Sequence, residues 1–297
     1  MKLIKPSFEI LEQPSGLEGV YKQIERAGRV CYKSENKITE DSAKPFVDRM
    51  IKSGHGAMLE HGTVCMERYS IKDDNLEWAY KYNLNPYAQV SYGTGSHRVG
   101  KVLYNTMYVT TNLRVLVEGN YLGDLKYLCE PTKYHGKRIT VKFICDRGVS
   151  HEFVRHRVFS FAQESTRYCN YSKDKFGNEL TFIEPPWLDD LEWDTYTDIY
   201  KSSLACSEDA YFELLKQWNE RIPDKRYKSG FKNNPWTPQQ ARAVLPNSLK
   251  TELVMTGFVS DWKHFFELRC SPSAHPQARE LAIPLQEEFI SRGYVNN

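Results

Sequence analysis

The 297-residue sequence lacks the cysteine spacing of a metal or disulfide scaffold. Its seven cysteines are scattered, odd in number, and form no Cys-x-x-Cys pair. Thiols spaced in this way are typical of a reduced, cytoplasmic protein rather than of a disulfide framework or a zinc site. The sequence also has no run of about eighteen apolar residues and no apolar signal core after Met1, so we expect a soluble protein with no membrane partner.

Neither sign of charge is in large excess, since 40 Lys and Arg stand against 38 Asp and Glu, with a formal net charge of +2. A protein that binds nucleic acid non-specifically usually has a basic excess or stripe, so we expect no nucleic-acid partner and only local recognition of anions. There is no internal repeat. With 40% hydrophobic and 13% aromatic residues, the chain can bury a core in one large domain or two small ones.

Hydrophobic periodicity predicts a mixture of strands and helices. Alternating apolar residues predict strands at 64–71, 138–145 and 249–259. Helical spacing predicts helices at 150–157, 194–218 and 276–292. Residues 72–101 are polar, rich in Tyr and Gly and without a clear period, so we interpret them as an irregular insertion.

One stretch, residues 155–168, concentrates side chains that bind anions. It holds three arginines, a histidine and two serines, at Arg155, His156, Arg157, Ser160, Ser165 and Arg167. The planar donor fork of arginine matches phosphate oxygens, and serine hydroxyls add donors without adding charge. We interpret the stretch as an anion site. The alternative is a solvated face on which Arg155 and Arg157 form salt bridges with Glu152 and Glu164.

Two other chemistries fit this region poorly. His151 and His156 are five residues apart, so on a helix their side chains diverge by roughly 140°, and Arg155 takes the place of the second zincin histidine. We therefore expect no metal site. Ser160 and Ser165 have arginines rather than a general base beside them, which argues against a nucleophile. Phosphate contacts and local capping or turn bonds are the two alternatives for these serines.

Further candidates lie outside this stretch. His61, in a glycine-rich segment before a predicted strand, is either a ligand contact or an ordinary satisfied loop histidine. Arg269 and Arg279 flank a turn and the start of a predicted helix, whose amino end favours an anion. Together with residues 155–168 they indicate one multi-arginine site built from remote segments, with room for more than one phosphorylated ligand.

The pattern Arg155-His156-Arg157-x-x-Ser160-x-x-x-x-Ser165-x-Arg167 resembles the signature of the flavin-dependent thymidylate synthases at all six fixed positions. Segments 59–63, 241–246 and 268–279 support the resemblance, which runs from about residue 50 to 285. It implies a single α/β domain of the α+β type over residues 1–297, with a central antiparallel sheet flanked by helices and an insertion near 72–101. It also implies a homotetramer whose active sites combine residues of different subunits.

The resemblance implies the reductive methylation of dUMP to dTMP. The carbon donor would be 5,10-methylenetetrahydrofolate, FAD would supply the hydride, and NADPH would supply the electrons. In the family no enzyme cysteine attacks the pyrimidine, which agrees with seven cysteines in no activated setting. The competing interpretation is a phosphate-binding RNA module that uses the same arginines with Tyr and Phe stacking on bases, and the near-zero net charge counts against it.

Matching positions imply roles for individual residues. The implied cofactor contacts are His61, Thr63, Arg155, His156, Arg157, Glu267, Arg269 and His275. The implied dUMP contacts are Glu152, Arg155, Gln163, Glu164, Ser165, Thr166, Arg167, Lys250 and Arg279. Ser165 and Arg167 would hold the phosphate. Catalysis is assigned to Ser165 and to Arg279, whose guanidinium would stabilise negative charge developing on the uracil ring.

The sequence departs from the family pattern at three positions. Glu252 follows Thr251 where many members have an arginine, and Lys250 is the candidate substitute for that cation. Glu267 stands where an asparagine is common, and His275 where a glutamine is common.

Overall fold

The computed structural model describes residues 1–70, 74–93, 97–99, 102–188, 195–216 and 235–296. The strands are β1 (Lys2–Ile4), β2 (Ser7–Leu11), β3 (Thr63–Ser70), β4 (Gln89–Tyr92), β5 (His97–Val99), β6 (Val102–Asn112), β7 (Arg138–Asp146), β8 (Ser160–Gln163), β9 (Thr181–Ile183) and β10 (Lys250–Phe258). The α-helices are α1 (Gly16–Val30), α2 (Ala43–Lys52), α3 (Gly56–Leu59), α4 (Asp74–Asn83), α5 (Leu113–Glu118), α6 (Arg147–Phe153), α7 (Thr195–Leu215), α8 (Pro238–Ala241), α9 (Val259–Arg269) and α10 (Pro276–Ser291). This mixture confirms the α/β class.

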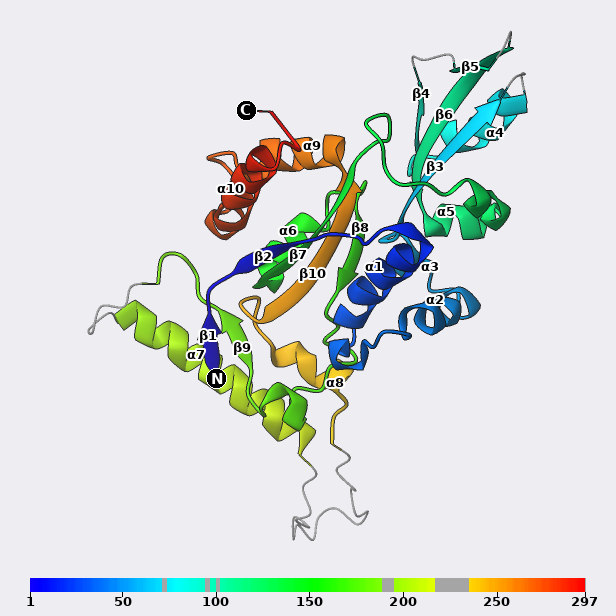
Figure 1. Cartoon of the computed structure of the whole chain (residues 1–297). Helices are drawn as coiled ribbons and strands as arrows, with labels where there is room; N and C mark the ends of the chain where they lie inside the picture. The colour runs from blue at the N-terminus through cyan, green and yellow to red at the C-terminus, as the bar shows by residue number, and fades with distance from the viewer. Residues whose placement is uncertain (71–73, 94–96, 100–101, 189–194, 217–234, 297) are drawn as a thin grey trace.

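A central antiparallel sheet has the strand order β2-β7-β10-β8. In its register Met255 of β10 lies opposite Val141 of β7 and Phe161 of β8. The strands predicted at 138–145 and 249–259 are thereby confirmed, as is the antiparallel sheet. Figure 1 shows α9 and α10 on one side of this sheet and α1 on the other.

Each face of the central sheet has its own buried core. On one face, Phe143 and Met255 pack with Trp262 and Phe265 of α9 and Leu285 of α10. On the other face, Ala27 and Val30 of α1 pack against Ala162 of β8 and Val254 of β10. Since apolar side chains cover both faces, the polar candidates are confined to the strand ends and the connections between elements.

The segment 72–101 is not the irregular insertion that the sequence predicted. It contains α4, β4 and β5, while residues 72–73, 94–96 and 100–101 lie outside the described residues. β4 and β5 both pair with β6, and β6 also pairs with β3. Trp78 and Tyr82 of α4 are buried against this second sheet. Strand pairing and burial impose this structure on a segment whose local periodicity is weak.

The helix that leads into residues 155–168 is displaced from its predicted position. α6 begins at Arg147 because Oδ1 of Asp146 accepts the Val149 N–H at 2.7 Å, and it ends at Phe153 rather than at residue 157. Arg155 and Arg157 therefore lie in a turn. The predicted helix at 276–292 corresponds to α10 and is confirmed, as is the one at 194–218, of which α7 covers the described part.

One glycine lets the arginine-rich stretch lie close to the sheet. A Cβ at Gly257 of β10 would fall 2.6 Å from ring atoms of Phe159. The bare backbone therefore leaves room for this ring, which anchors the chain between the turn and β8. Among the described residues, no helix is both long and apolar enough to cross a membrane.

Candidate functional site

The arginine-rich stretch is divided by β8. Arg155 and Arg157 lie in the turn before this strand, and Ser165 and Arg167 lie in the turn after it. Four residues of extended strand span roughly 13 Å, so the two turns lie at opposite ends of β8. The stretch therefore presents two separate groups of polar side chains.

Before β8, Arg269 at the end of α9 holds the end of α6. Its Nη1 lies 2.6 Å from Oε2 of Glu152, its Nη2 donates to the Glu152 carbonyl at 2.8 Å, and its Nε donates to Nε2 of His156 at 3.0 Å. Burial, with Arg269, His264 and Arg155 nearby, lowers the pKa of His156 to about 4. His156 is consequently neutral at physiological pH and acts here as an acceptor.

Arg155 and Arg157 are exposed. Within the described residues, no side chain or backbone group forms a hydrogen bond or ion pair with either guanidinium. The carboxylates proposed as their partners are engaged elsewhere, Glu152 by Arg269 and Glu164 by Lys250. The alternative of a salt-bridged, solvated face is therefore wrong. The turn that Arg269 holds in place therefore carries two exposed arginines without counter-ions in the described structure.

After β8, the chain enters a buried network of charges. Glu164 is 2% exposed and lies 2.9 Å from Nζ of Lys250, and it accepts a 2.9 Å hydrogen bond from the Tyr171 hydroxyl. Glu252 lies between Lys250 at 2.7 Å and Lys33 at 2.8 Å. Burial raises the pKa of Glu252, but the two lysines outweigh that effect and lower it to about 2. Two lysines thus balance the charge of Glu252, the residue that stands where many family members have an arginine.

Lys33 and Tyr171 belong to this network but to none of the motifs recognised in the sequence. Lys33 follows α1 with a φ of 47°, a left-handed conformation uncommon for lysine, and it joins Glu252 across 219 positions of sequence. No local pattern indicates either contact. Gln163, a predicted dUMP contact, is also engaged, since its amide donates to the Ser150 hydroxyl at 2.8 Å.

Ser165 and Ser160 occupy different environments. The Ser165 N–H donates to the Cys31 carbonyl, and its hydroxyl oxygen accepts the Arg167 N–H at 3.3 Å, which is the local turn bond given as one alternative. The hydroxyl hydrogen of Ser165 can still donate to a ligand. Ser160 is 1% exposed, so it cannot meet a ligand from solvent. Thr166 is also buried.

His61 and Thr63 lie where α3 leads into β3. His61 is fully buried, with Nδ1 2.8 Å from the Thr256 hydroxyl, and burial beside Arg138 lowers its pKa to about 3. The Thr63 hydroxyl lies 3.2 Å from Nη1 of Arg138. Across the part of the chain that the structure describes, no hydrogen bond or ion pair connects His61 or Thr63 with residues 155–157.

The C-terminal candidates divide between two places. Glu267 is exposed on α9 and 3.4 Å from His264. Arg279 lies in the first turn of α10, where Gln277 donates to Oδ2 of Asp146 at 2.6 Å. Since Asp146 pairs with Lys250 in the sheet, the start of α10 lies at the same sheet end as the charge network. His275, at the N-cap of α10, is exposed, with its ring 5.8 Å from that of Trp187.

Comparison with known proteins places these groups in a family context. The sequence model of the family described as thymidylate synthase complementing protein matches residues 136–292. The flavin-dependent thymidylate synthase of Mycolicibacterium gilvum is 33% identical over 145 residues, which are 49% of this chain and 54% of that protein. That of Mycobacterium avium is 35% identical over 137 residues, 46% of this chain and 51% of that protein. The chain thus spans about half the length of the curated relatives it matches.

Among solved structures, the chain is similar to a UMP/dUMP methylase, PolB from Streptomyces cacaoi, bound with 5-Br dUMP. The match covers 98% of this chain and 93% of that one at 16% identity. Its TM-score of 0.38 is too low for any conclusion about shared structure.

Proposed function

The chain belongs to the thymidylate synthase complementing protein family, and from that premise we propose that it is a flavin-dependent thymidylate synthase. The reaction would convert dUMP to dTMP with 5,10-methylenetetrahydrofolate as carbon donor and NADPH as electron source, in the cytoplasm. The observation that supports it best is the pair of exposed guanidiniums at Arg155 and Arg157, without counter-ions in the described residues. Flavin, nucleotide and NADPH all carry phosphates, which such cations bind.

The residues before β8 fit a flavin. Arg155 and Arg157 would bind its diphosphate or compensate the anionic reduced ring, while Glu152, His156 and Arg269 keep that turn in place. When bound, the flavin supplies the hydride. Further proposed cofactor contacts, from other segments, are Thr63, Glu267 and His275. His61 is buried and neutral, so we propose that it stabilises the sheet through its contact with Thr256 of β10 rather than touching the flavin.

The residues after β8 fit a nucleotide. Ser165 and Arg167 would donate to its phosphate, and both lie in the turn at the strand end. Lys250 and Glu164, each held by the buried network, would position this turn; Gln163 and Thr166 adjoin it. Arg279 lies half-buried in the first turn of α10 at the same sheet end, and its guanidinium would meet the uracil edge and stabilise charge developing there.

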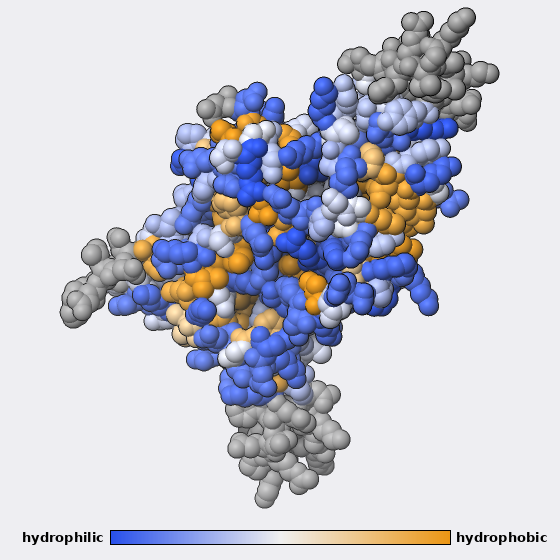
Figure 2. All heavy atoms as spheres, viewed as in Figure 1, coloured by the Kyte–Doolittle hydropathy of each residue, from blue (hydrophilic) through white to orange (hydrophobic). Residues whose placement is uncertain are grey.

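A homotetramer with shared active sites is the proposed assembly. The two groups of the arginine-rich stretch lie at opposite ends of β8, so one subunit would contribute each group to a different site. Trp187, before α7, is 59% exposed, which is unusual for a large apolar side chain and suits a subunit interface. Figure 2 shows apolar side chains gathered in separate patches on a largely hydrophilic face.

An absorption spectrum of the purified protein tests the proposal. We expect the visible bands of oxidised flavin, and we expect anaerobic NADPH to bleach them faster when dUMP is present. The double variant Arg155→Ala/Arg157→Ala should lose the bands, whereas Arg49→Ala, which removes an exposed arginine from α2, should keep them. A colourless protein that cannot be reconstituted with FAD would contradict the proposal and leave a phosphate or RNA ligand for the same arginines.

A further inference from the structure

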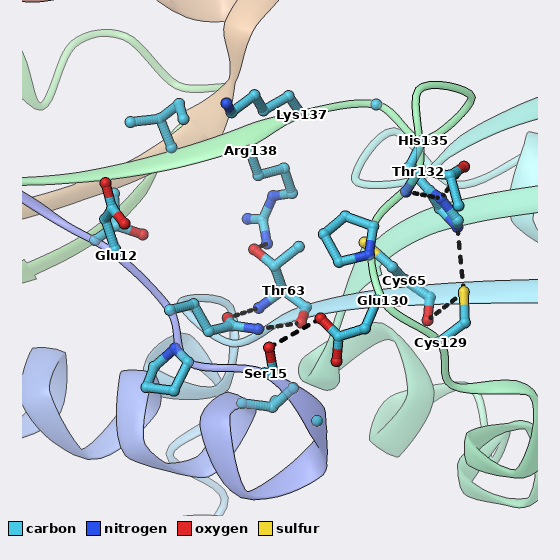
Figure 3. Close-up of a pocket in the computed structure, with 18 of the residues that line it drawn as sticks. Glu12, Ser15, Thr63, Cys65, Cys129, Glu130, Thr132, His135, Lys137 and Arg138 are labelled. Atoms are coloured by element: carbon cyan, nitrogen blue, oxygen red, sulfur yellow. Dashed lines mark hydrogen bonds between the residues drawn. The ribbon is translucent and has the colours of Figure 1, made fainter. Parts of the chain in front are cut away.

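A cleft lies beside the start of β7, and none of residues 155–168 lines it. Its volume is about 610 Å³, within the range of small-molecule sites. The linker after β2, the start of β3 and the segment 128–138 form its walls, as Figure 3 shows. Of the residues assigned above to flavin or nucleotide, only Thr63 lines it.

The guanidinium of Arg138 points into this cleft toward Thr63 (Figure 3). Nη1 donates to the Thr63 hydroxyl at 3.2 Å and Nη2 to the Glu60 carbonyl at 3.0 Å, and both acceptors are neutral. The guanidinium also lies 5.6 Å from the centre of the Phe258 ring. In the described part of the chain, no carboxylate lies within ion-pair distance of Arg138.

The nearest carboxylates are engaged by other groups. Glu60 pairs with Arg114, and Asp261 accepts the Phe258 N–H at 2.9 Å. Burial lowers the pKa of Arg138 to about 10, although Glu60 and Asp261 raise it. The side chain is therefore still protonated at neutral pH, and a part-buried cation without a contacting counter-ion is unfavourable unless an anion joins it.

The other charges of the cleft leave room for an anion. Glu12 pairs with Arg292 at 2.8 Å, and Glu130 accepts a hydrogen bond from Ser15 at 2.9 Å. Lys133 and Lys137 are exposed on the cleft wall, and Nζ of Lys137 lies 3.6 Å from the centre of the Tyr294 ring. Two lysines and one guanidinium thus line the cleft together with the paired Glu12 and with Glu130, whose partner among the described residues is a neutral hydroxyl.

We propose that this cleft binds the oxyanion, phosphate or carboxylate, of a small molecule other than the flavin, with Arg138 as its principal donor. The guanidinium uses only neutral acceptors in the protein and keeps further N–H donors for a bidentate contact. Lys133 and Lys137 would attract the anion to the cleft. The anion site is inferred from this geometry, whereas the comparison with and without flavin and the choice of organic probes rest on the proposed function.

Calorimetric titration of inorganic pyrophosphate into the full chain, with flavin bound and after its removal, tests the proposal. We expect binding in both states, and we expect Arg138→Gln to weaken it about tenfold or more. Arg49→Ala is the matched control and should bind like the parent protein. Absence of binding, unchanged binding in Arg138→Gln, or loss of binding when flavin is present would each overturn the proposal; the last result would assign the cleft to the flavin itself.

Arg138 also donates hydrogen bonds to the Thr63 hydroxyl and the Glu60 carbonyl, so its substitution can impair folding. Alkylation of Cys129, which lines the cleft, provides a readout in the unmodified sequence, with exposed Cys206 on α7 as internal control. Pyrophosphate should slow the labelling of Cys129 but not of Cys206, and equal rates would contradict the site. Titration with adenosine 2′,5′-bisphosphate, which carries phosphates, and with p-aminobenzoylglutamate, which carries carboxylates, then shows which oxyanion the cleft binds. This comparison can be read whether or not the protein proves to be a thymidylate synthase.

Discussion

Replacing Glu252 by glutamine should destabilise the protein by about 2 to 3 kcal/mol at neutral pH. The pKa of this carboxyl group is lowered from 4.5 to about 2, because Lys250 and Lys33 outweigh the effect of burial. At about 1.36 kcal/mol per pH unit, this difference corresponds to about 3 kcal/mol of stabilisation. Glutamine retains a hydrogen-bond acceptor, so part of the contact with the lysines survives and the loss should not exceed this value.

The sign of the effect gives a pH window. Because the pKa is lower in the folded protein, the stabilisation from Glu252 is complete above about pH 4.5 and is lost as the pH falls toward 2. Urea unfolding followed by tryptophan fluorescence would give the free energy of unfolding of both proteins from pH 7 to pH 3. The difference between them should be largest at pH 7 and should shrink below pH 4.5.

Glu35 provides the matched control because it contacts the same lysine from the solvent side. Its carboxylate lies 2.8 Å from Nζ of Lys33 and is 37% exposed, against 9% for Glu252. An exposed ion pair contributes little, so Glu35→Gln should cost at most about 0.5 kcal/mol. Equal losses in the two variants, or a difference for Glu252→Gln that stays constant down to pH 3, would refute the buried network as the source of stability.

Three further predictions concern the proposed ligand sites. Arg157→Ala should weaken FAD binding, measured by fluorescence titration, without lowering the thermal midpoint. Arg269→Ala should lower the free energy of unfolding by about 2 kcal/mol, because it removes the hydrogen bonds that hold the end of α6. Equal thermal midpoints in the two variants would contradict a binding role for Arg157 and a structural role for Arg269. Ser165→Ala should weaken dUMP binding in calorimetry, and unchanged affinity with collapsed turnover would show that its role is not binding. Arg279→Ala should slow flavin reoxidation by dUMP plus methylenetetrahydrofolate in stopped-flow absorbance while FAD stays bound, and loss of FAD would disprove that role.

Much of the central architecture could be predicted from local pattern. The strands at 138–145 and 249–259 and the helix at 276–292 have clear periodicity, because their alternating or helical apolar positions meet a buried core. Residues 72–101 could not be predicted in this way. Their strands form because β6 supplies hydrogen-bond partners, and neither the pairing nor the burial of Tyr82 can be recognised within a short window.

The sequence by itself determined the family and the absence of any large charge excess, and it predicts an anion site at residues 155–168. Only the tertiary structure decided which charges are free. Arg269 engages Glu152 over 117 positions and Lys250 engages Glu164 over 86, so Arg155 and Arg157 are left without counter-ions in the described structure. Lys33 engages Glu252 over 219 positions and completes the network that holds the half-buried Lys250. Residue type and spacing specify what a side chain can bind, but its actual partners depend on which distant segments the packed core brings to the same strand end.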